Sequence, residues 1–295
     1  MRRVLVTVAA LLLLPGCSGL MLLPDRELVL NPGTVGVGYR DVQIPTTDGL
    51  SLHGWFLPAE TQGEPAATVL FLHGNAENIS NHLASVYWLP ERGFNVLIFD
   101  YRGYGRSEGE ADLEGAVADV QSALGYLAER REGEPLVVLG QSLGGALAPY
   151  AVSRSPYRER VSAVVLDSTF ASFRAVAREK LAGFWLTWPF QWPLSWTISD
   201  RYRPARYIPA LHPIPVLVVH NEGDRIIPVH HGRALYRAAR EPKALWVLPG
   251  GRHVYTFRRP ETRDRLAAYL WEQVRTPGQE KPALPAGPQF RLDTL

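Results

Sequence analysis

The chain has 295 residues, of which 46% are hydrophobic and 20% are charged, and this composition excludes disorder, collagen and coiled coil as descriptions of the whole chain. Its 31 basic and 29 acidic residues leave a formal net charge of +2 without any basic block, so a nucleic-acid partner has no electrostatic support. Cys17 is the single cysteine, which excludes an internal disulfide framework and a cysteine-based zinc site.

The first sixteen residues have the pattern of an export signal. Residues 1–3 are Met-Arg-Arg, and residues 4–14 form an apolar run that is too short to span a membrane. The run ends in residues 14–18, Leu-Pro-Gly-Cys-Ser, which resemble a bacterial lipobox. This resemblance implies cleavage before Cys17, a lipid on that cysteine and, because Ser18 follows it, a place in the cell envelope on the outer membrane facing the periplasm. The alternative is an ordinary signal peptide with an incidental cysteine.

Strands and helices alternate after an expected tether over residues 17–34. Strands are predicted at residues 39–44, 50–56, 68–72, 96–99, 136–139, 161–166, 216–219 and 244–248. Helices are predicted at residues 82–92, 113–130, 144–153, 229–239 and 261–274. Uninterrupted apolar strands that alternate with helices indicate an α/β fold, with a mostly parallel central sheet of about eight strands and helices on both faces. The proline-rich residues 276–295 are expected to form a disordered tail.

A glycine-x-serine-x-glycine motif follows the fifth predicted strand directly and precedes a predicted helix. It consists of Gly140, Ser142 and Gly144 with Gln141 and Leu143 between them. This sequence is typical of a sharp turn that lifts the serine hydroxyl above the edge of the sheet. Gly140 and Gly144 are required because the strand and the helix pass too close for a Cβ. The turn also directs the Leu143 N–H at the oxygen that becomes negatively charged during attack by Ser142.

A serine nucleophile needs a base, and the base needs an acid that orients it. Asp224 follows the seventh predicted strand, and His253 follows the eighth. The carboxyl ends of parallel strands meet at one edge of a sheet, which brings both residues to the edge that carries Ser142. We predict that His253 takes the proton of Ser142 and that Asp224 holds the imidazole. Asp167 stays open as a rival acid, because it too follows a predicted strand.

The order of serine, aspartate and histidine along the chain is that of the α/β-hydrolase triad. The chain therefore resembles an α/β-hydrolase-fold serine hydrolase over residues 35–275, in the small, lid-poor branch of acyl hydrolases and relatives of the prolyl-oligopeptidase catalytic domain. The resemblance implies one catalytic domain that uses no cofactor. It also implies an oxyanion hole whose second N–H comes just after His73-Gly74, which assigns it to Asn75. No metal site is predicted, because the H-E-x-x-H pattern is absent.

Half of the eight tryptophans fall within twelve residues, at Trp185, Trp188, Trp192 and Trp196. They lie in residues 167–213, where the resemblance implies a short lid or insertion. Three interpretations of this segment stay open. The tryptophans could pack the core of the insertion, Trp185, Trp188 and Trp192 could form an apolar wall for an acyl group, or the segment could be an interfacial belt that touches a membrane.

These patterns predict a serine hydrolase that cleaves carboxylic or thio esters through an acyl-enzyme intermediate. The expected partners are a small-molecule or lipid-like ester and the membrane that would hold a lipid anchor, without nucleic acid. Two alternatives stay open. One is a serine peptidase of the prolyl-oligopeptidase-like type, since the same triad cleaves amides, and the other is a non-catalytic lipoprotein that binds a partner.

Overall fold

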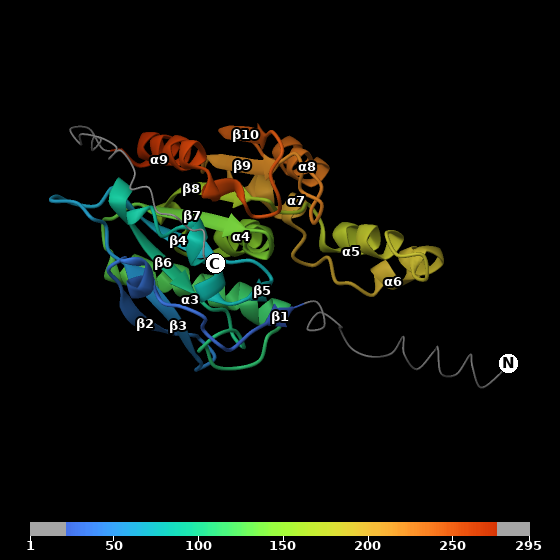
Figure 1. The fold of residues 1–295 in the computed structure, drawn as a ribbon, viewed down its shortest axis with the longest axis horizontal. Helices are drawn as coiled ribbons and strands as arrows, with labels where there is room; N and C mark the ends of the chain where they lie inside the picture. The colour runs from blue at the N-terminus through green and yellow to red at the C-terminus, as the bar shows by residue number, and fades with distance from the viewer. Residues whose placement is uncertain (1–21, 276–295) are drawn as a thin grey trace.

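Eight strands form the central sheet of the computed structural model, which describes residues 22–275 (Figure 1). The predicted export signal, Cys17 and the predicted tail lie outside the described residues. The strands are β2 (Arg40–Pro45), β3 (Ser51–Leu57), β4 (Ala67–Leu72), β6 (Phe94–Phe99), β7 (Leu136–Gln141), β8 (Val161–Asp167), β9 (Val216–Asn221) and β10 (Lys243–Leu248).

The strands lie in the order β10-β9-β8-β7-β4-β6-β3-β2. Strand β3 is antiparallel to both of its neighbours, and all other neighbours in the sheet are parallel. Strands β4, β6 and β7 are buried along their whole length, which explains their mostly apolar sequences. The predicted α/β-hydrolase fold, with a mostly parallel sheet of about eight strands, is confirmed.

Helices cover both faces of the sheet and enclose two hydrophobic cores. Buried side chains of α3 (Leu113–Arg130), α4 (Leu143–Arg154) and α8 (His230–Ala238) belong to one core. Those of α2 (Ile79–His82) and α9 (Pro260–Val274) belong to the other. Asp112 caps the N-terminus of α3, because its carboxylate accepts a hydrogen bond from the Gly115 N–H. Its buried positions recur every three or four residues, as the predicted helix required.

The helix predicted over residues 82–92 is wrong. The chain instead forms α2 and two short 3-10 turns, Leu83–Ser85 and Pro90–Arg92. Val86 leaves the helical region with φ −137°, and Trp88 donates its indole N–H to the Ser85 carbonyl. Apolar residues point into the core from a series of turns here, so their spacing imitates one face of a helix.

Part of the expected tether packs on the domain. Leu22 is buried, and β1 (Leu23–Pro24) pairs in parallel with β5 (Ala76–Glu77). The Asn78 side-chain amide donates hydrogen bonds to the carbonyls of Asp25 and Glu27. The folded part of the chain therefore begins before residue 35, because these backbone groups find partners in the loop after β4.

The segment between β8 and β9 contains α5 (Phe173–Ala182), α6 (Gln191–Trp196) and α7 (Pro204–Tyr207). Helices α5 and α6 project from the side of the body formed by the sheet and its covering helices, whereas α7 returns to it (Figure 1). Within residues 22–275, none of the helices is both long enough and apolar enough to cross a membrane.

Candidate active site

Ser142 occupies a strained turn between β7 and α4. Its backbone has φ 52° and ψ −111°, a conformation that is costly for a residue with a side chain. Two hydrogen bonds hold it there: the Ser142 N–H donates to the Asp167 carbonyl at 2.9 Å, and the Thr169 hydroxyl donates to the Ser142 carbonyl at 2.6 Å. The strained conformation is therefore maintained by contacts to β8 and the loop that follows it.

The two glycines of the motif lie where backbones meet. A Cβ on Gly140 would lie 2.6 Å from the Gly144 carbonyl oxygen, and one on Gly144 would overlap the Leu72 backbone. The Gly144 N–H also donates to the His73 carbonyl at 3.1 Å. These are the close approaches that the motif predicted, and they join the turn to the loop after β4.

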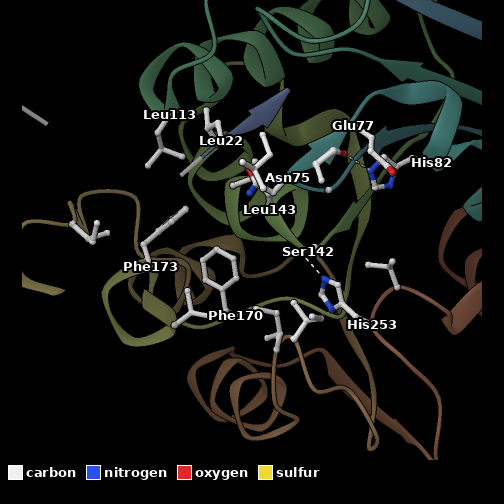
Figure 2. A pocket seen from close by; sticks show the side chains of 18 of the residues that line it. Leu22, Asn75, Glu77, His82, Leu113, Ser142, Leu143, Phe170, Phe173 and His253 are labelled. Carbon is white, nitrogen blue, oxygen red and sulfur yellow. Dashed lines mark hydrogen bonds between the residues drawn. The ribbon is translucent and has the colours of Figure 1, made fainter. Parts of the chain in front are cut away.

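Ser142, His253 and Asp224 lie in one continuous hydrogen-bond path. The Ser142 Oγ is 3.0 Å from the His253 Nε2, and the His253 Nδ1 is 2.7 Å from the Asp224 Oδ2. Figure 2 shows His253 directed at Ser142. The other Asp224 oxygen accepts the Ile226 and Ile227 N–H groups at 2.8 and 2.9 Å. Burial alone would raise the pKa of Asp224, but the hydrogen bonds from His253 and the two amides hold this pKa below its usual value.

Asp167, the rival acid, lies in a different network. Its buried carboxyl accepts hydrogen bonds from the Gln141 side-chain amide at 2.9 Å, the Ser168 hydroxyl at 3.0 Å and the Thr256 hydroxyl at 2.6 Å. Burial raises the pKa of Asp167 despite these donors. The acid that meets the His253 ring is thus Asp224, whereas Asp167 links β7, β8 and the segment that carries Thr256.

The two predicted oxyanion residues lie beside Ser142, where Asn75 and Leu143 both line the cavity (Figure 2). Leu143 is the first residue of α4, so its N–H has no acceptor within the helix. The His73 Nδ1 lies 2.8 Å from the Gly74 carbonyl oxygen. Burial lowers the pKa of His73 well below its usual value, so the neutral ring donates Nδ1–H to Gly74. Because C=O and N–H point in opposite directions in a trans peptide, this bond sets the direction of the Asn75 N–H.

A cavity of about 530 Å³ opens at Ser142, with mostly apolar walls. Its lining residues are Leu22, Leu23, Gly74, Asn75, Ala76, Glu77, His82, Leu113, Ser142, Leu143, Phe170, Phe173, Val176, Ile198, Ser199, Ile226, Ile227, His253 and Val254. The expectation that Trp185, Trp188 and Trp192 line this pocket is wrong. These tryptophans are 54–78% exposed, because they lie on the part of the insertion that projects from the body (Figure 1).

Most of the residues that line the cavity were not predicted from the sequence, and three of them connect the cavity to segments outside the predicted site. Leu22 and Leu23 come from the expected tether, and the only signal they offered is the short apolar run of residues 20–23 after Cys17. His82 also lines it, and its Nε2 lies 3.1 Å from the Ala76 carbonyl oxygen. Burial lowers the pKa of His82, so the ring is neutral and donates this hydrogen bond to the loop that carries Asn75.

One group of possible metal ligands joins α5 to α8 within residues 22–275. Glu179, His230 and His231 bring their ligand atoms within 4.8 Å of one another, and we refer to them as the α5–α8 cluster. The Glu179 carboxylate lies 3.0 Å from the His230 Nε2 and 3.2 Å from the His231 Nε2. None of the three lines the cavity. The 51-residue separation of Glu179 from His230 leaves no motif by which the sequence could indicate this group.

Comparisons with known proteins agree with the fold. A family model described as "Serine aminopeptidase, S33" matches residues 63–207. The uncharacterised protein YfhR of Escherichia coli (strain K12) is 40% identical over 222 residues, which cover 74% of each chain. The α/β-hydrolase domain-containing protein WAV2 of Arabidopsis thaliana is 32% identical, over 83% of this chain and 79% of WAV2. The solved structure of the Pyrococcus furiosus esterase Pf2001 superposes with a TM-score of 0.69 and 24% identity, over 86% of this chain and 98% of that one. The chain belongs to the α/β-hydrolase family.

Proposed function

We propose that this hydrolase cleaves carboxylic or thio esters through an acyl-enzyme intermediate. The observation that carries the proposal is the hydrogen-bond path from Asp224 through His253 to Ser142, at a cavity with apolar walls. An ionised Asp224 accepts the Nδ1–H of His253, so the Nε2 presents its lone pair to the Ser142 hydroxyl. That tautomer is the one that a general base requires.

In the proposed reaction, the Ser142 Oγ attacks the ester carbonyl carbon while its proton moves to the His253 Nε2. Asp224 stabilises the imidazolium that forms. The carbonyl oxygen becomes negative and accepts hydrogen bonds from the Leu143 and Asn75 N–H groups, and the loss of one such donor typically lowers kcat by about 10²–10³. The alcohol or thiol then leaves with the proton from His253. Water repeats the attack, releasing the carboxylic acid and regenerating Ser142.

The walls of the cavity favour an apolar acyl group. Phe170, Phe173 and Val176 line it on the side of the insertion, and all three are buried. Burying one methylene contributes about 0.8 kcal/mol, which corresponds to a factor of about four in kcat/KM. We expect kcat/KM for p-nitrophenyl esters to rise with acyl length by up to about that factor per methylene, until the cavity is filled.

Covalent labelling tests the proposal. A fluorophosphonate probe should label the protein, and Ser142→Ala should abolish labelling while leaving the circular dichroism spectrum and the melting temperature close to those of the wild type. The absence of labelling in well-folded wild-type protein would instead support the non-catalytic alternative. The p-nitrophenyl ester series then measures ester hydrolysis directly.

A serine peptidase is the second candidate, and the family model named for a serine aminopeptidase favours it. An aminopeptidase needs an anion for the substrate ammonium group, and Glu77 is the single carboxylate among the lining residues. If the chain is an aminopeptidase, it should hydrolyse aminoacyl p-nitroanilides, and Glu77→Gln should raise KM for them. If it is an esterase, p-nitrophenyl esters should be turned over far faster, with little response to Glu77→Gln.

We further propose that Cys17 carries a lipid that holds the protein on the outer membrane, facing the periplasm. The support is the lipobox-like sequence that ends the apolar run of residues 4–14. Growth with an alkyne-labelled fatty acid should label the wild type and leave Cys17→Ser unlabelled. Membrane fractionation should then find the wild type with the outer membrane. An unlabelled wild-type protein in the soluble fraction would contradict this proposal.

A further inference from the structure

The tryptophans of this protein fall into two groups. Four are at most 9% exposed, namely Trp55, Trp88, Trp246 and Trp271. The other four are 54–78% exposed and all lie within residues 185–196. Four more apolar side chains around them are 40–58% exposed. We call these eight side chains the aromatic lid patch: Phe184, Trp185, Leu186, Trp188, Phe190, Trp192, Leu194 and Trp196. Exposed apolar surface gathered in one short segment is typical of an interaction site.

The charges around this patch favour an anionic partner. Residues 181–199 contain no charged residue, whereas residues 174–180 and 200–203 contain five basic and two acidic ones. Both acids are engaged within the protein: Glu179 contacts the two histidines of the α5–α8 cluster, and Asp200 accepts a hydrogen bond from Ser172 and pairs with Arg203. Because Arg201 also pairs with Glu114, the positive charge of the rim rests on Arg174, Arg178 and Lys180. Arg178 lies over the Trp192 ring at 4.4 Å. Tryptophan next to arginine and lysine is the composition of segments that lie in the interface of an anionic bilayer.

The patch and the cavity are built from the same insertion. Phe173 and Val176 of α5 and Ile198 just after α6 line the cavity, while the exposed aromatic side chains lie between them in the sequence. Helices α5 and α6 contact each other and project together from the body (Figure 1). A surface that binds the patch therefore lies close to one wall of the cavity.

The N-terminal segment reaches the same cavity from another direction. Leu22 and Leu23 line it, and Leu23 is 60% exposed. Cys17 precedes Leu22 by five residues, which span at most about 18 Å when fully extended. An acyl chain on Cys17 would therefore keep the bilayer within about this distance of the cavity.

We propose that the aromatic lid patch inserts into the interfacial layer of a phospholipid bilayer and that the cavity takes its ester substrate from that bilayer. This inference rests on the proposed esterase function and names its substrate class, an acyl ester dissolved in the membrane. A bilayer fits better than a second copy of the chain, because a two-fold contact would bring the basic rim of the patch against itself. Anionic headgroups neutralise that rim instead.

Tryptophan fluorescence tests the docking step with the intact, lipid-anchored protein. The protein is reconstituted into vesicles of phosphatidylcholine and phosphatidylglycerol, with or without brominated acyl chains. The four exposed tryptophans should be quenched by the bromolipid and protected from aqueous iodide. The four buried tryptophans supply the background, which is measured with Trp→Ser substitutions at all four exposed positions. Trp→Phe at the same positions is the matched control, because it keeps large apolar side chains on the patch.

Each outcome decides for or against docking. Quenching by bromolipid that disappears in the Trp→Ser variant supports insertion. Quenching by iodide alone would overturn the proposal, because the patch would then face water. Protection from both quenchers, accompanied by crosslinked dimers, would also overturn it, because a second copy would then cover the patch.

Substrate delivery is tested by comparing two esters. Water-soluble p-nitrophenyl butyrate and a long-chain fluorogenic ester dissolved in the vesicles are each given to the anchored wild type and to both variants. We expect the Trp→Ser variant to retain turnover of the soluble ester within about twofold and to lose at least about tenfold on the vesicle ester, equivalent to about 1.4 kcal/mol. The Trp→Phe variant should keep most of the vesicle activity.

The two proposals fail in different ways in this experiment. If the esterase function is wrong, the wild type hydrolyses neither ester. If only the inference is wrong, the wild type hydrolyses the soluble ester and the Trp→Ser variant equals it on the vesicle ester. Circular dichroism and the melting temperature of the variants exclude misfolding as the cause of any loss.

Discussion

Asp224→Asn is the most informative single substitution, because the structure dictates how the new side chain must sit. One Asp224 oxygen accepts the N–H groups of Ile226 and Ile227, and the other accepts from the His253 Nδ1. An asparagine keeps the two hydrogen bonds from the Ile226 and Ile227 N–H groups only if its side-chain oxygen replaces the carboxylate oxygen that accepts them. Its NH2 group then faces the His253 Nδ1, which must become an acceptor, so the ring proton moves to Nε2, opposite the Ser142 hydroxyl.

The expected cost follows from this change of tautomer. With the proton on Nε2, His253 no longer accepts the Ser142 proton, and this defect lowers kcat by about 10⁴ in a serine protease triad. That factor corresponds to about 5 kcal/mol of transition-state stabilisation. The free energy of unfolding should change by less than about 1 kcal/mol, since the asparagine side chain has the same shape and retains the hydrogen bonds from the two backbone N–H groups.

Asp167→Asn is the matched control. Its NH2 group would face the Gln141 amide if the oxygen keeps the Ser168 and Thr256 bonds. Two buried NH2 groups that face each other without an acceptor cost about 1–3 kcal/mol of stability. The substitution leaves the tautomer of His253 unaffected, because Asp167 does not contact that ring. We expect kcat on p-nitrophenyl butyrate to fall by less than about tenfold, with a lower urea midpoint. A loss of about 10⁴ in Asp167→Asn, beside near-normal Asp224→Asn, would refute this reasoning.

Three further outcomes are expected. Gly144→Ala should lower stability by about 1–3 kcal/mol and also kcat, whereas Gly38→Ala, with no atom within 4 Å of the new Cβ, should change neither; urea unfolding and ester assays measure both. Hydrogen bonds from Thr46 and Arg102 hold the pKa of Asp48 at about 2, so its stabilising contribution is present above about pH 4 and lost as the pH falls through 2; Asp48→Asn should therefore destabilise the protein less at pH 2 than at pH 6. Removal of metal ions by EDTA should leave ester hydrolysis unchanged, because the α5–α8 cluster lies outside the cavity lining; a loss that zinc restores would contradict this.

The fold was predictable because its strands are buried on both faces. Strands β4, β6 and β7 contain no exposed position, so their apolar runs stand out against the amphipathic α3. Pro149 lies inside α4, and the helix nevertheless runs on to Arg154, since a single missing hydrogen bond is outweighed by the packing of its buried side chains. The order of the strands in the sheet depends on crossovers and cannot be read from local pattern.

The site residues that follow a strand directly were predictable from the sequence. The pairing of side chains within the site was not, because it depends on tertiary contacts. Ser142, Asp224 and His253 all sit just beyond strand ends, at one edge of the sheet. The choice between Asp224 and Asp167 as the acid of the triad required the distance from each carboxylate to the His253 ring. The tryptophan spacing of three, four and four fits a buried or an exposed face equally well, because spacing reports which side chains share a face but not what covers that face.

The pairing of β1 with β5 has a consequence for how the protein is shortened. The Leu23 N–H donates to the Asn75 carbonyl, and the Tyr104 hydroxyl donates to the same oxygen. Removing the first 34 residues would delete Leu22 and Leu23, and with them part of the cavity wall and one hydrogen bond to the Asn75 carbonyl oxygen. A shortened protein should therefore keep the chain from residue 22 onwards. The choice of its first residue would otherwise lower turnover as well as stability.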